Sequence, residues 1–308
     1  MKSETGLLND GTKEAPKLRV YLNLGNLADL PSRSIWSGAD GLECLARLKE
    51  DGFEGIQLTT DVPPLDGSPL PHCGLDRINA PADADSVARK HADRGDLCLT
   101  VHAGWGMEGD EDVFRLVEAI LLASDRRSIP IFVETHRATI TQDIWRTVQL
   151  TKKFPEMRFN GDFSHYYCGQ ELPYGDWQSK MLFLEPIFDR VGFIHGRISS
   201  SGCMQVPIDA DLHSRPKQAH GRVNYLEHFR ELWTRAMLGF LRTADKGDVL
   251  IFAPELLPGA NYYARLSPDC FGLLAEECDR YAQALLYREL AQLCFNDAQR
   301  LLNIEDCA

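Results

Sequence analysis

The chain has 308 residues, of which 44% are hydrophobic and 25% are charged, values typical of a protein that buries a full core. Its formal net charge of −12 argues against nucleic-acid binding, because that affinity comes mostly from Lys and Arg at phosphates. The nine cysteines are scattered and form no Cys-x-x-Cys pair, which excludes a recognisable disulfide framework or zinc ribbon and favours a reducing, cytoplasmic location.

The first 17 residues lack the apolar core of a signal peptide. No apolar run approaches the roughly 18 residues needed to cross a bilayer, so we expect no membrane partner. We expect a flexible tail over residues 1–17 and one domain over residues 18–308, because the length suits a single α/β barrel of about 250 residues with insertions.

Short apolar segments typical of buried strands alternate with segments of helical periodicity along the whole chain. The strands expected are residues 18–25, 53–58, 75–79, 96–102, 129–134, 157–162, 191–195 and 249–255, of which 75–79 gives the weakest signal. The helices expected include residues 40–52, 83–94, 110–124, a helix through 144–148 capped by Thr139 or Thr141, 223–242 and 271–302.

This alternation predicts right-handed βα units around a parallel sheet, and we expect a closed (β/α)8 TIM barrel. No GxGxxG motif follows the first predicted strand and no GxxxxGK[ST] motif is present, so a nucleotide-binding doubly wound sheet is not supported. One βα unit is irregular, because residues 59–81 form a proline-rich stretch that predicts a long loop. A C-terminal helical segment over residues 271–303 completes the expected fold.

Four of the predicted strands end on a potential metal ligand, namely Glu134, Asp162, His195 and Glu255. Parallel barrels carry their chemistry at the carboxyl ends of the strands, so these side chains are expected to meet. Three carboxylates and one imidazole suit one divalent ion, with Mn²⁺, Mg²⁺ or Co²⁺ favoured and Zn²⁺ possible. The alternative is that each acid only caps a helix or lies in solvent.

The segments VETHRATIT at Glu134, GDFSHYY at Asp162, FIHGR at His195 and FAPEL at Glu255 resemble the xylose isomerase-like barrel superfamily. That superfamily includes D-tagatose 3-epimerase, hydroxypyruvate isomerase, inosose dehydratase and endonuclease IV. The resemblance covers roughly residues 18–263. It implies a metal-dependent sugar isomerase or epimerase with a carbohydrate substrate, in which Glu134 and Glu255 bind the metal and exchange the proton. It also implies that Asp162 and His195 are ligands and that His165 contacts a substrate oxygen.

Such a reaction removes a proton from the carbon beside a carbonyl, and it needs a stabilised enediolate. Arg197 could bind a substrate hydroxyl, carboxylate or phosphate as a planar fork, or form a structural ion pair with Glu134 or Asp162. His102 and Trp105 could wall a sugar-binding site, although ordinary packing explains them equally well.

Two other activities are compatible with this inventory. A trinuclear zinc phosphodiester hydrolase like endonuclease IV would use extra ligands such as His72, His102, His165, Asp211 and His213, but the acidic charge opposes it. A metal-dependent dehydratase begins with the same proton abstraction. The long segment 199–220 and the loop 59–81 are expected to select the substrate, and a homo-oligomer is possible.

Overall fold

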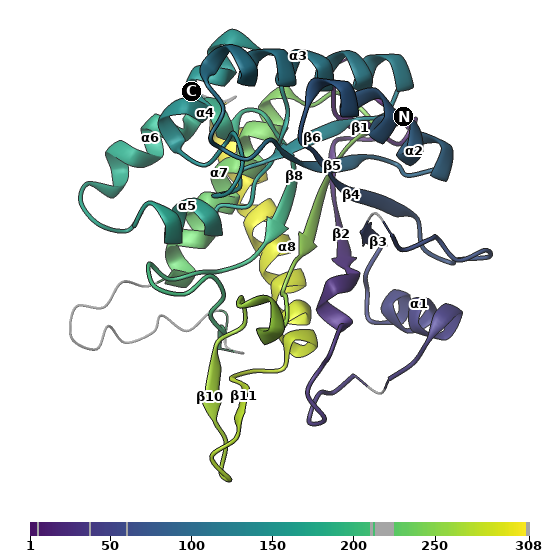
Figure 1. Ribbon diagram of the computed structural model, residues 1–308, viewed down its shortest axis with the longest axis vertical. Coiled ribbons are helices and arrows are strands. Elements are labelled where there is room, and N and C mark those ends of the chain that lie inside the picture. The colour runs from purple at the N-terminus through teal and green to yellow at the C-terminus, as the bar shows by residue number, and fades with distance from the viewer. Residues whose placement is uncertain (5, 37, 60, 210–211, 213–224, 306–308) are drawn as a thin grey trace.

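Eight parallel strands, β2 to β9, close into a barrel in the computed structural model, which describes residues 1–4, 6–36, 38–59, 61–209, 212 and 225–305 (Figure 1). The strands are β2 (Lys17–Asn23), β3 (Gly55–Thr59), β4 (His72–Ile78), β5 (Leu99–Ala103), β6 (Ile131–Glu134), β7 (Phe159–Asn160), β8 (Val191–Gly196) and β9 (Asp248–Pro254). Each pairs with the next in chain order, and β9 also pairs with β2. The predicted TIM barrel is therefore confirmed.

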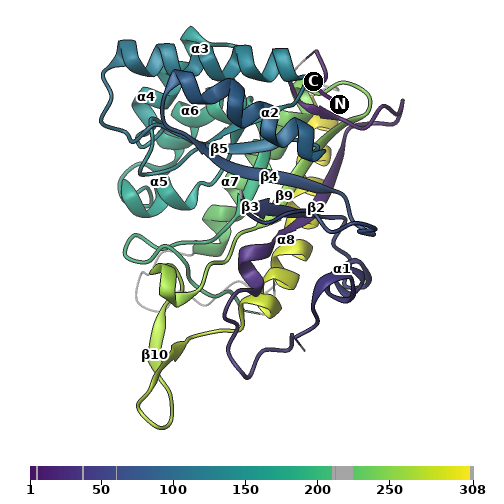
Figure 2. The same cartoon turned by 45° about the vertical axis from the view of Figure 1, so that its right-hand side comes forward.

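Helices surround the barrel, and Figure 2 shows α8 running along the side formed by β9 and β2. They are α1 (Gly41–Glu50), α2 (Ala84–Arg94), α3 (Asp110–Arg127), α4 (Ile144–Lys153), α5 (Ser164–Gly169), α6 (Trp177–Phe188), α7 (Tyr225–Thr243) and α8 (Arg280–Glu305). Short 3-10 turns lie at η1 (Leu24–Leu27), η2 (Pro81–Asp83) and η3 (Gly259–Asn261). Among the described residues, no helix is long and apolar enough to span a membrane.

The register of the strands brings their carboxyl ends to one level. Glu134 on β6 pairs with Asn160 on β7, and His195 on β8 pairs with Ala253 on β9. Both β8 and β9 are buried along their whole length, as expected for parallel strands covered by helices on one face and by the barrel core on the other. We call this end of the barrel the rim.

The proline-rich segment behaves as a loop. In the part of it that is described, no helix separates β3 from β4. The second half of the segment contains a longer strand than its sequence pattern predicts. Strand β4 begins at His72 and pairs with both β3 and β5. Barrel closure supplies hydrogen bonds on both edges, which a polar strand such as HCGLDRI does not reveal by periodicity alone.

The N-terminal residues differ from the expected flexible tail. Strand β1 (Leu8–Asn9) pairs antiparallel with β9, and Leu7 and Leu8 are buried. The pairing is possible because β8 meets β9 only from Ile251 onward, which leaves the start of β9 at Asp248 and Val249 open to another strand.

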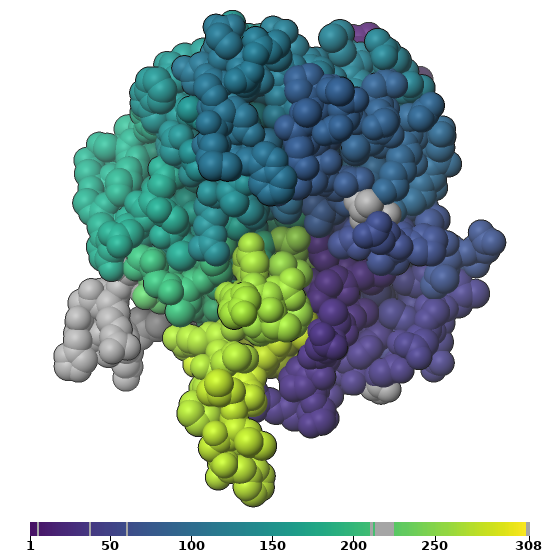
Figure 3. Space-filling model, viewed as in Figure 1, coloured from purple at the N-terminus to yellow at the C-terminus, as the bar shows by residue number. Residues whose placement is uncertain are grey.

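The C-terminal helix starts later than predicted. Residues 266–276 form a hairpin of β10 (Leu266–Pro268) and β11 (Leu274–Glu276), which projects from the molecule in Figures 1 and 3. The carboxylate of Asp269 accepts hydrogen bonds from the backbone of Phe271 and Leu273, which stabilises a turn in place of a helix. The first apolar residues of the predicted helix, Phe271 and Leu274, therefore belong to an exposed hairpin, and Phe271 is 84% exposed.

The helix α4 also begins differently. Asp143, rather than Thr139 or Thr141, is its N-cap, and its carboxylate accepts a hydrogen bond from the backbone of Arg146. Thr141 instead donates its hydroxyl hydrogen to the carbonyl of Glu134, which fixes the loop that follows β6.

Candidate metal centre

The four predicted ligands meet at the rim. One ligand atom from each of Glu134, Asp162, His195 and Glu255 lies within 4.8 Å of the other three. The first three residues are fully buried, and Glu255 is 5% exposed. The closed barrel thus gathers three carboxylates and an imidazole from four successive strand ends into one buried cluster.

A chain of hydrogen bonds sets the tautomer of His195. The backbone N–H of Gly25 donates to Asn23 Oδ1 (2.8 Å), so the amide nitrogen of Asn23 faces Gln57 Oε1 and donates to it (2.8 Å). Gln57 Oε1 lies 2.9 Å from His195 Nε2, which must then carry the proton of the neutral ring. This orientation leaves the lone pair of Nδ1 available to a cation.

Asn160 fixes the same ring from the other side. Its Oδ1 accepts the backbone N–H of His195 (2.9 Å), which directs its amide N–H groups toward His195 Nδ1 (3.0 Å) and Glu134 Oε2 (3.2 Å). Nδ1 itself lies 3.2 Å from Glu134 Oε2 and 3.3 Å from Glu255 Oε2. The unprotonated nitrogen therefore faces the carboxylates.

Arg197 is the counter-ion of this cluster. Its Nη2 donates to Asp162 Oδ2 (2.7 Å) and to Glu255 Oε2, and the residue is 1% exposed. The expected ion pair with Asp162 is thus present, and the second partner is Glu255 rather than Glu134. Three ionised carboxylates and one guanidinium leave two negative charges, which a divalent cation would neutralise.

The pKa values of the two glutamates move in opposite directions. Burial alone would raise the pKa of Glu134, but His102 and His195 hold it well below its ordinary value. Burial raises the pKa of Glu255 above its ordinary value despite the opposing charges of His195 and Arg197. Burial opposes protonation of His195, yet Glu255 and Glu134 raise its pKa to about 9, which shows how strongly the carboxylates favour positive charge at this point.

Several buried polar atoms at the rim have no hydrogen-bond partner among the described residues. They are Glu134 Oε1, both ring nitrogens of His165, and Nε and Nη1 of Arg197. Buried polar groups in folded proteins are nearly always paired, so these atoms mark places where a cation or a polar ligand would complete the site. The residues therefore fit a divalent ion.

Three histidine rings line one side of the cluster. The centroid of His136 lies 4.4 Å from that of His102 and 3.9 Å from that of His165. Burial and the neighbouring His165 lower the pKa of His136 to about 2, and burial together with Arg197 lowers that of His165. His102 differs: burial lowers its pKa, but Glu134, 3.2 Å from Nε2, raises it on balance. His102, Glu134 and His136 form a second group with ligand spacing.

Two other predicted residues lie outside the ligand cluster, Trp105 on the exposed side of the rim and His72 at the far end of the strands. The ring of Trp105 is 52% exposed, and the guanidinium of Arg77 covers it at 3.8 Å from the centroid. His72 opens β4, at the opposite end of the strands, and contacts Asp96 (3.3 Å). Asp211 and His213 lie outside the described residues.

The sequence analysis missed Gln57 and Asn160 and gave no role to Tyr263. Gln57 and Asn160 are fully buried polar residues inside otherwise apolar strands, and that contrast is a usable sequence signal. Tyr263 follows η3, and its ring covers the guanidinium of Arg197 at 4.5 Å. Nothing in its local sequence predicts that contact.

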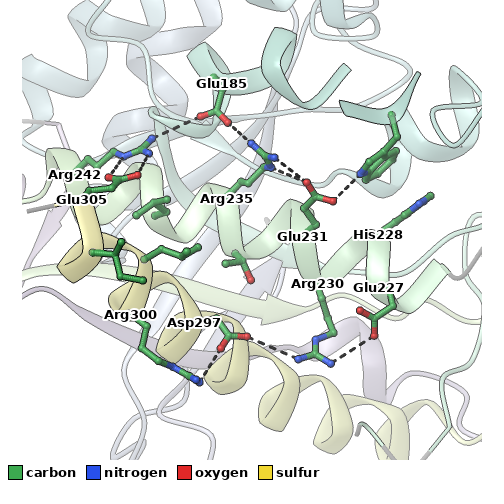
Figure 4. Close-up of a pocket in the computed structure, with 15 residues that line it drawn as sticks. Glu185, Glu227, His228, Arg230, Glu231, Arg235, Arg242, Asp297, Arg300 and Glu305 are labelled. Carbon is green, nitrogen blue, oxygen red and sulfur yellow. Dashed lines mark hydrogen bonds and ion pairs between the residues drawn. The ribbon is translucent and has the colours of Figure 1, made fainter. Parts of the chain in front are cut away.

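A cavity of about 910 Å³ on the outer surface between α6, α7 and α8 does not contain these residues (Figure 4). Its walls carry a network of ion pairs, in which Arg235 lies 2.6 Å from Glu185 and 2.9 Å from Glu231. These charges are partly exposed and mutually paired, so the outer cavity carries no excess charge comparable to that of the rim.

Similarity to known proteins is structural. No protein-family model matches the sequence, and a search of curated proteins gave no match. The structure is similar to the probable 3-DHS dehydratase AsbF of Bacillus anthracis, with TM-score 0.51, 15% identity, and coverage of 89% of this chain and 98% of that one. It is also similar to a xylose isomerase-like TIM barrel protein of Mycobacterium smegmatis in complex with magnesium, with TM-score 0.52, 11% identity, and coverage of 91% and 97%. The chain has the fold of the xylose isomerase-like TIM barrels.

Proposed function

We propose that this chain, with its xylose isomerase-like barrel, is a metal-dependent isomerase or epimerase of a sugar or sugar-like substrate. One observation carries the proposal: Glu134, Asp162, His195 and Glu255 place a ligand atom each within 4.8 Å of the others, buried at the carboxyl ends of parallel strands. The Mycobacterium smegmatis protein of the same fold was solved with magnesium. We infer that one divalent ion, with Mg²⁺, Mn²⁺ or Co²⁺ preferred for this oxygen-rich set, binds to these four residues.

The carboxylates have separate tasks in this proposal. When bound, the ion supplies Lewis-acid stabilisation of the negative charge that develops on the substrate oxygens. Glu134, whose pKa is lowered, is the ionised member that accepts the proton from the carbon beside the carbonyl. Glu255, whose pKa is raised, holds a proton more readily and returns it to the neighbouring carbon or to the opposite face.

Other rim residues position the substrate. His165 is fully buried and neither ring nitrogen makes a hydrogen bond, although Nε2 lies 3.5 Å from Asp162 and 3.7 Å from Glu134, so it is suited to a substrate hydroxyl. His102 holds Glu134 in its ionised state through the contact at 3.2 Å. Trp105, with an exposed ring, is available only to the outer part of a substrate.

Two alternatives keep the same rim. A dehydratase shares the first proton transfer, and the Bacillus anthracis protein with this fold is a probable dehydratase. A multinuclear phosphodiester hydrolase gains support from the second ligand group, His102, Glu134 and His136. His72 is not available to such a site, because it is the first residue of the seven-residue strand β4. At about 3.3 Å per residue, it lies about 20 Å from the rim.

Metal analysis combined with deuterium exchange tests the proposal. We expect one divalent ion per chain and incorporation of deuterium from heavy water beside the carbonyl of at least one ketose or aldose in a panel. Loss of water from the substrate would assign the dehydratase instead. Three ions per chain with cleavage of abasic DNA, or no exchange at all in the metal-loaded protein, would overturn the assignment.

A variant of the outer cavity provides the matched control. Glu185→Gln removes one carboxylate from the paired network of α6 and α7 and should leave metal content and exchange unchanged. Glu134→Gln makes the same chemical change at the rim and should abolish exchange.

A further inference from the structure

The rim carries two arginines that its carboxylates do not fully engage. Arg197 is buried at the base of the site, and Arg137 is exposed in the turn after β6. Both guanidinium groups lie near the ring of Tyr263, Arg197 at 4.5 Å and Arg137 at 6.0 Å from its centroid. The two cations therefore lie beside the same aromatic ring.

Arg197 keeps unused hydrogen-bonding capacity. Only its Nη2 contacts the ligands Asp162 and Glu255, whereas Nε and Nη1 are buried without a partner among the described residues. The ring of Tyr263 lies over one face of the guanidinium, so an acceptor approaches in its plane. A carboxylate oxygen is suited to that approach at Nη1, because a hydrogen bond to an anion is stronger than one to a neutral acceptor.

Arg137 has no carboxylate partner in the part of the chain that the structure describes. Its recorded contacts are Cys168 Sγ, 3.9 Å from Nη1, and the ring of Tyr263. Most other arginines of this acidic protein are paired, as in the network around Glu185.

We propose that the substrate is a carboxylate-bearing polyol, a sugar acid or keto acid, whose carboxylate is bound by Arg197 and Arg137. This inference rests on the proposed function, because it assigns a substrate class to the same rim. Since Arg197 also contacts Asp162 and Glu255, the carboxylate lies close to the carbon that exchanges its proton. A neutral sugar would leave Arg137 without an anionic partner among the described residues and would give Nε and Nη1 of Arg197 no charged acceptor.

Calorimetric binding of matched ligands tests this inference without requiring turnover. The metal-loaded protein is titrated with D-arabinonate, with D-arabinitol, which replaces the carboxylate by a hydroxymethyl group, and with D-arabinitol 5-phosphate. We expect arabinonate to bind at least about 10-fold more tightly than arabinitol, as for charge-assisted hydrogen bonds, and more tightly than the phosphate ester.

Variants of Arg137 separate arginine binding from direct chelation by the metal. Arg137→Gln should reduce the preference for arabinonate about 10-fold, whereas Arg137→Lys should keep part of it and Glu185→Gln all of it. An equal preference in the wild type and in Arg137→Gln would leave the carboxylate to the metal or to Arg197 and would overturn binding by the two arginines together. Tighter binding of arabinitol or of the phosphate ester would also overturn it. A prior metal titration of the wild type reports separately on the proposed function.

Discussion

Two buried clusters of histidine and carboxylate in this barrel differ in net charge. The rim cluster consists of Glu134, Asp162, His195, Glu255 and Arg197. The second, which we call the His91 cluster, lies beside β4 and α2 and consists of His91, Arg94, Asp76, Asp96 and His72. Both are rich in charge, yet only the rim cluster lies at the carboxyl ends of the strands.

The His91 cluster is balanced. His91 Nδ1 lies 2.5 Å from Asp96 Oδ2, its Nε2 lies 3.0 Å from Asp76 Oδ2, and Arg94 lies 2.8 Å from Asp96. Burial alone would lower the pKa of His91, but hydrogen bonds with Asp76 and Asp96 raise it. With His91 protonated, two cations face two carboxylates.

Counted in the same way, with His195 protonated, the rim cluster has three carboxylates facing two cations, which leaves one excess negative charge, and two when His195 is neutral. Burying like charges without compensation costs free energy, so a protein retains such a set only where something else binds. The comparison teaches that residue types alone do not distinguish a structural cluster from a functional one. The charge balance and the position at the carboxyl ends of the strands do, since His72 Nε2 and Asp96 Oδ1 of the His91 cluster also lack a hydrogen bond.

The largest expected effect is at the rim. Glu134→Gln should reduce deuterium exchange about 1,000-fold, because it removes both a metal ligand and the proposed base. The unfolding free energy of the metal-free protein should stay equal or rise, since one of three like charges is gone. Exchange rates and urea unfolding with a chelator measure the two quantities. Activity within tenfold of the wild type would show that the rim cluster is structural.

Removing a carboxylate from the His91 cluster should reduce stability and not activity. Asp96→Asn leaves His91 and Arg94 without their shared carboxylate and should lower the unfolding free energy by about 3 kcal/mol. Urea unfolding measures it, with Asp125→Asn as the control, because the side chain of Asp125 is 72% exposed in its pair with Lys2. Equal stability of the two variants would contradict the assignment of a structural role.

An intermediate effect is expected where the fold orients a ligand. Gln57→Met removes the acceptor of His195 Nε2 and should weaken metal binding about 10- to 100-fold. Thr100→Val removes only the partner of the amide nitrogen of Gln57 and should weaken binding less. Calorimetric metal titration measures the dissociation constants of the two variants. A larger loss of affinity in Thr100→Val than in Gln57→Met would refute the tautomer derived for His195.

The smallest effect concerns pH. Because the pKa of His91 is raised in the folded state, its contribution to stability should be complete below the unfolded value of about 6.5 and should disappear as pH rises through the folded pKa. Urea unfolding of the wild type and His91→Gln across this range measures the difference. A stability gap that widens with rising pH would have the wrong sign.

The sequence by itself determined the barrel and its four strand-end ligands. Alternating strand and helix segments permit few topologies, and parallel strands necessarily bring their carboxyl ends to one rim. For that reason Glu134, Asp162, His195 and Glu255 could be found from their position after apolar runs.

Only the tertiary structure decided which charges are balanced. The amide of Asn23 reaches Glu255 (3.2 Å) across 232 positions of sequence, and Arg197 reaches Glu255 across 58. It also decided that Leu7 and Leu8 pack against β9 and that Phe271 lies in a hairpin. These contacts depend on the register and closure of the barrel, which no local pattern of residues records.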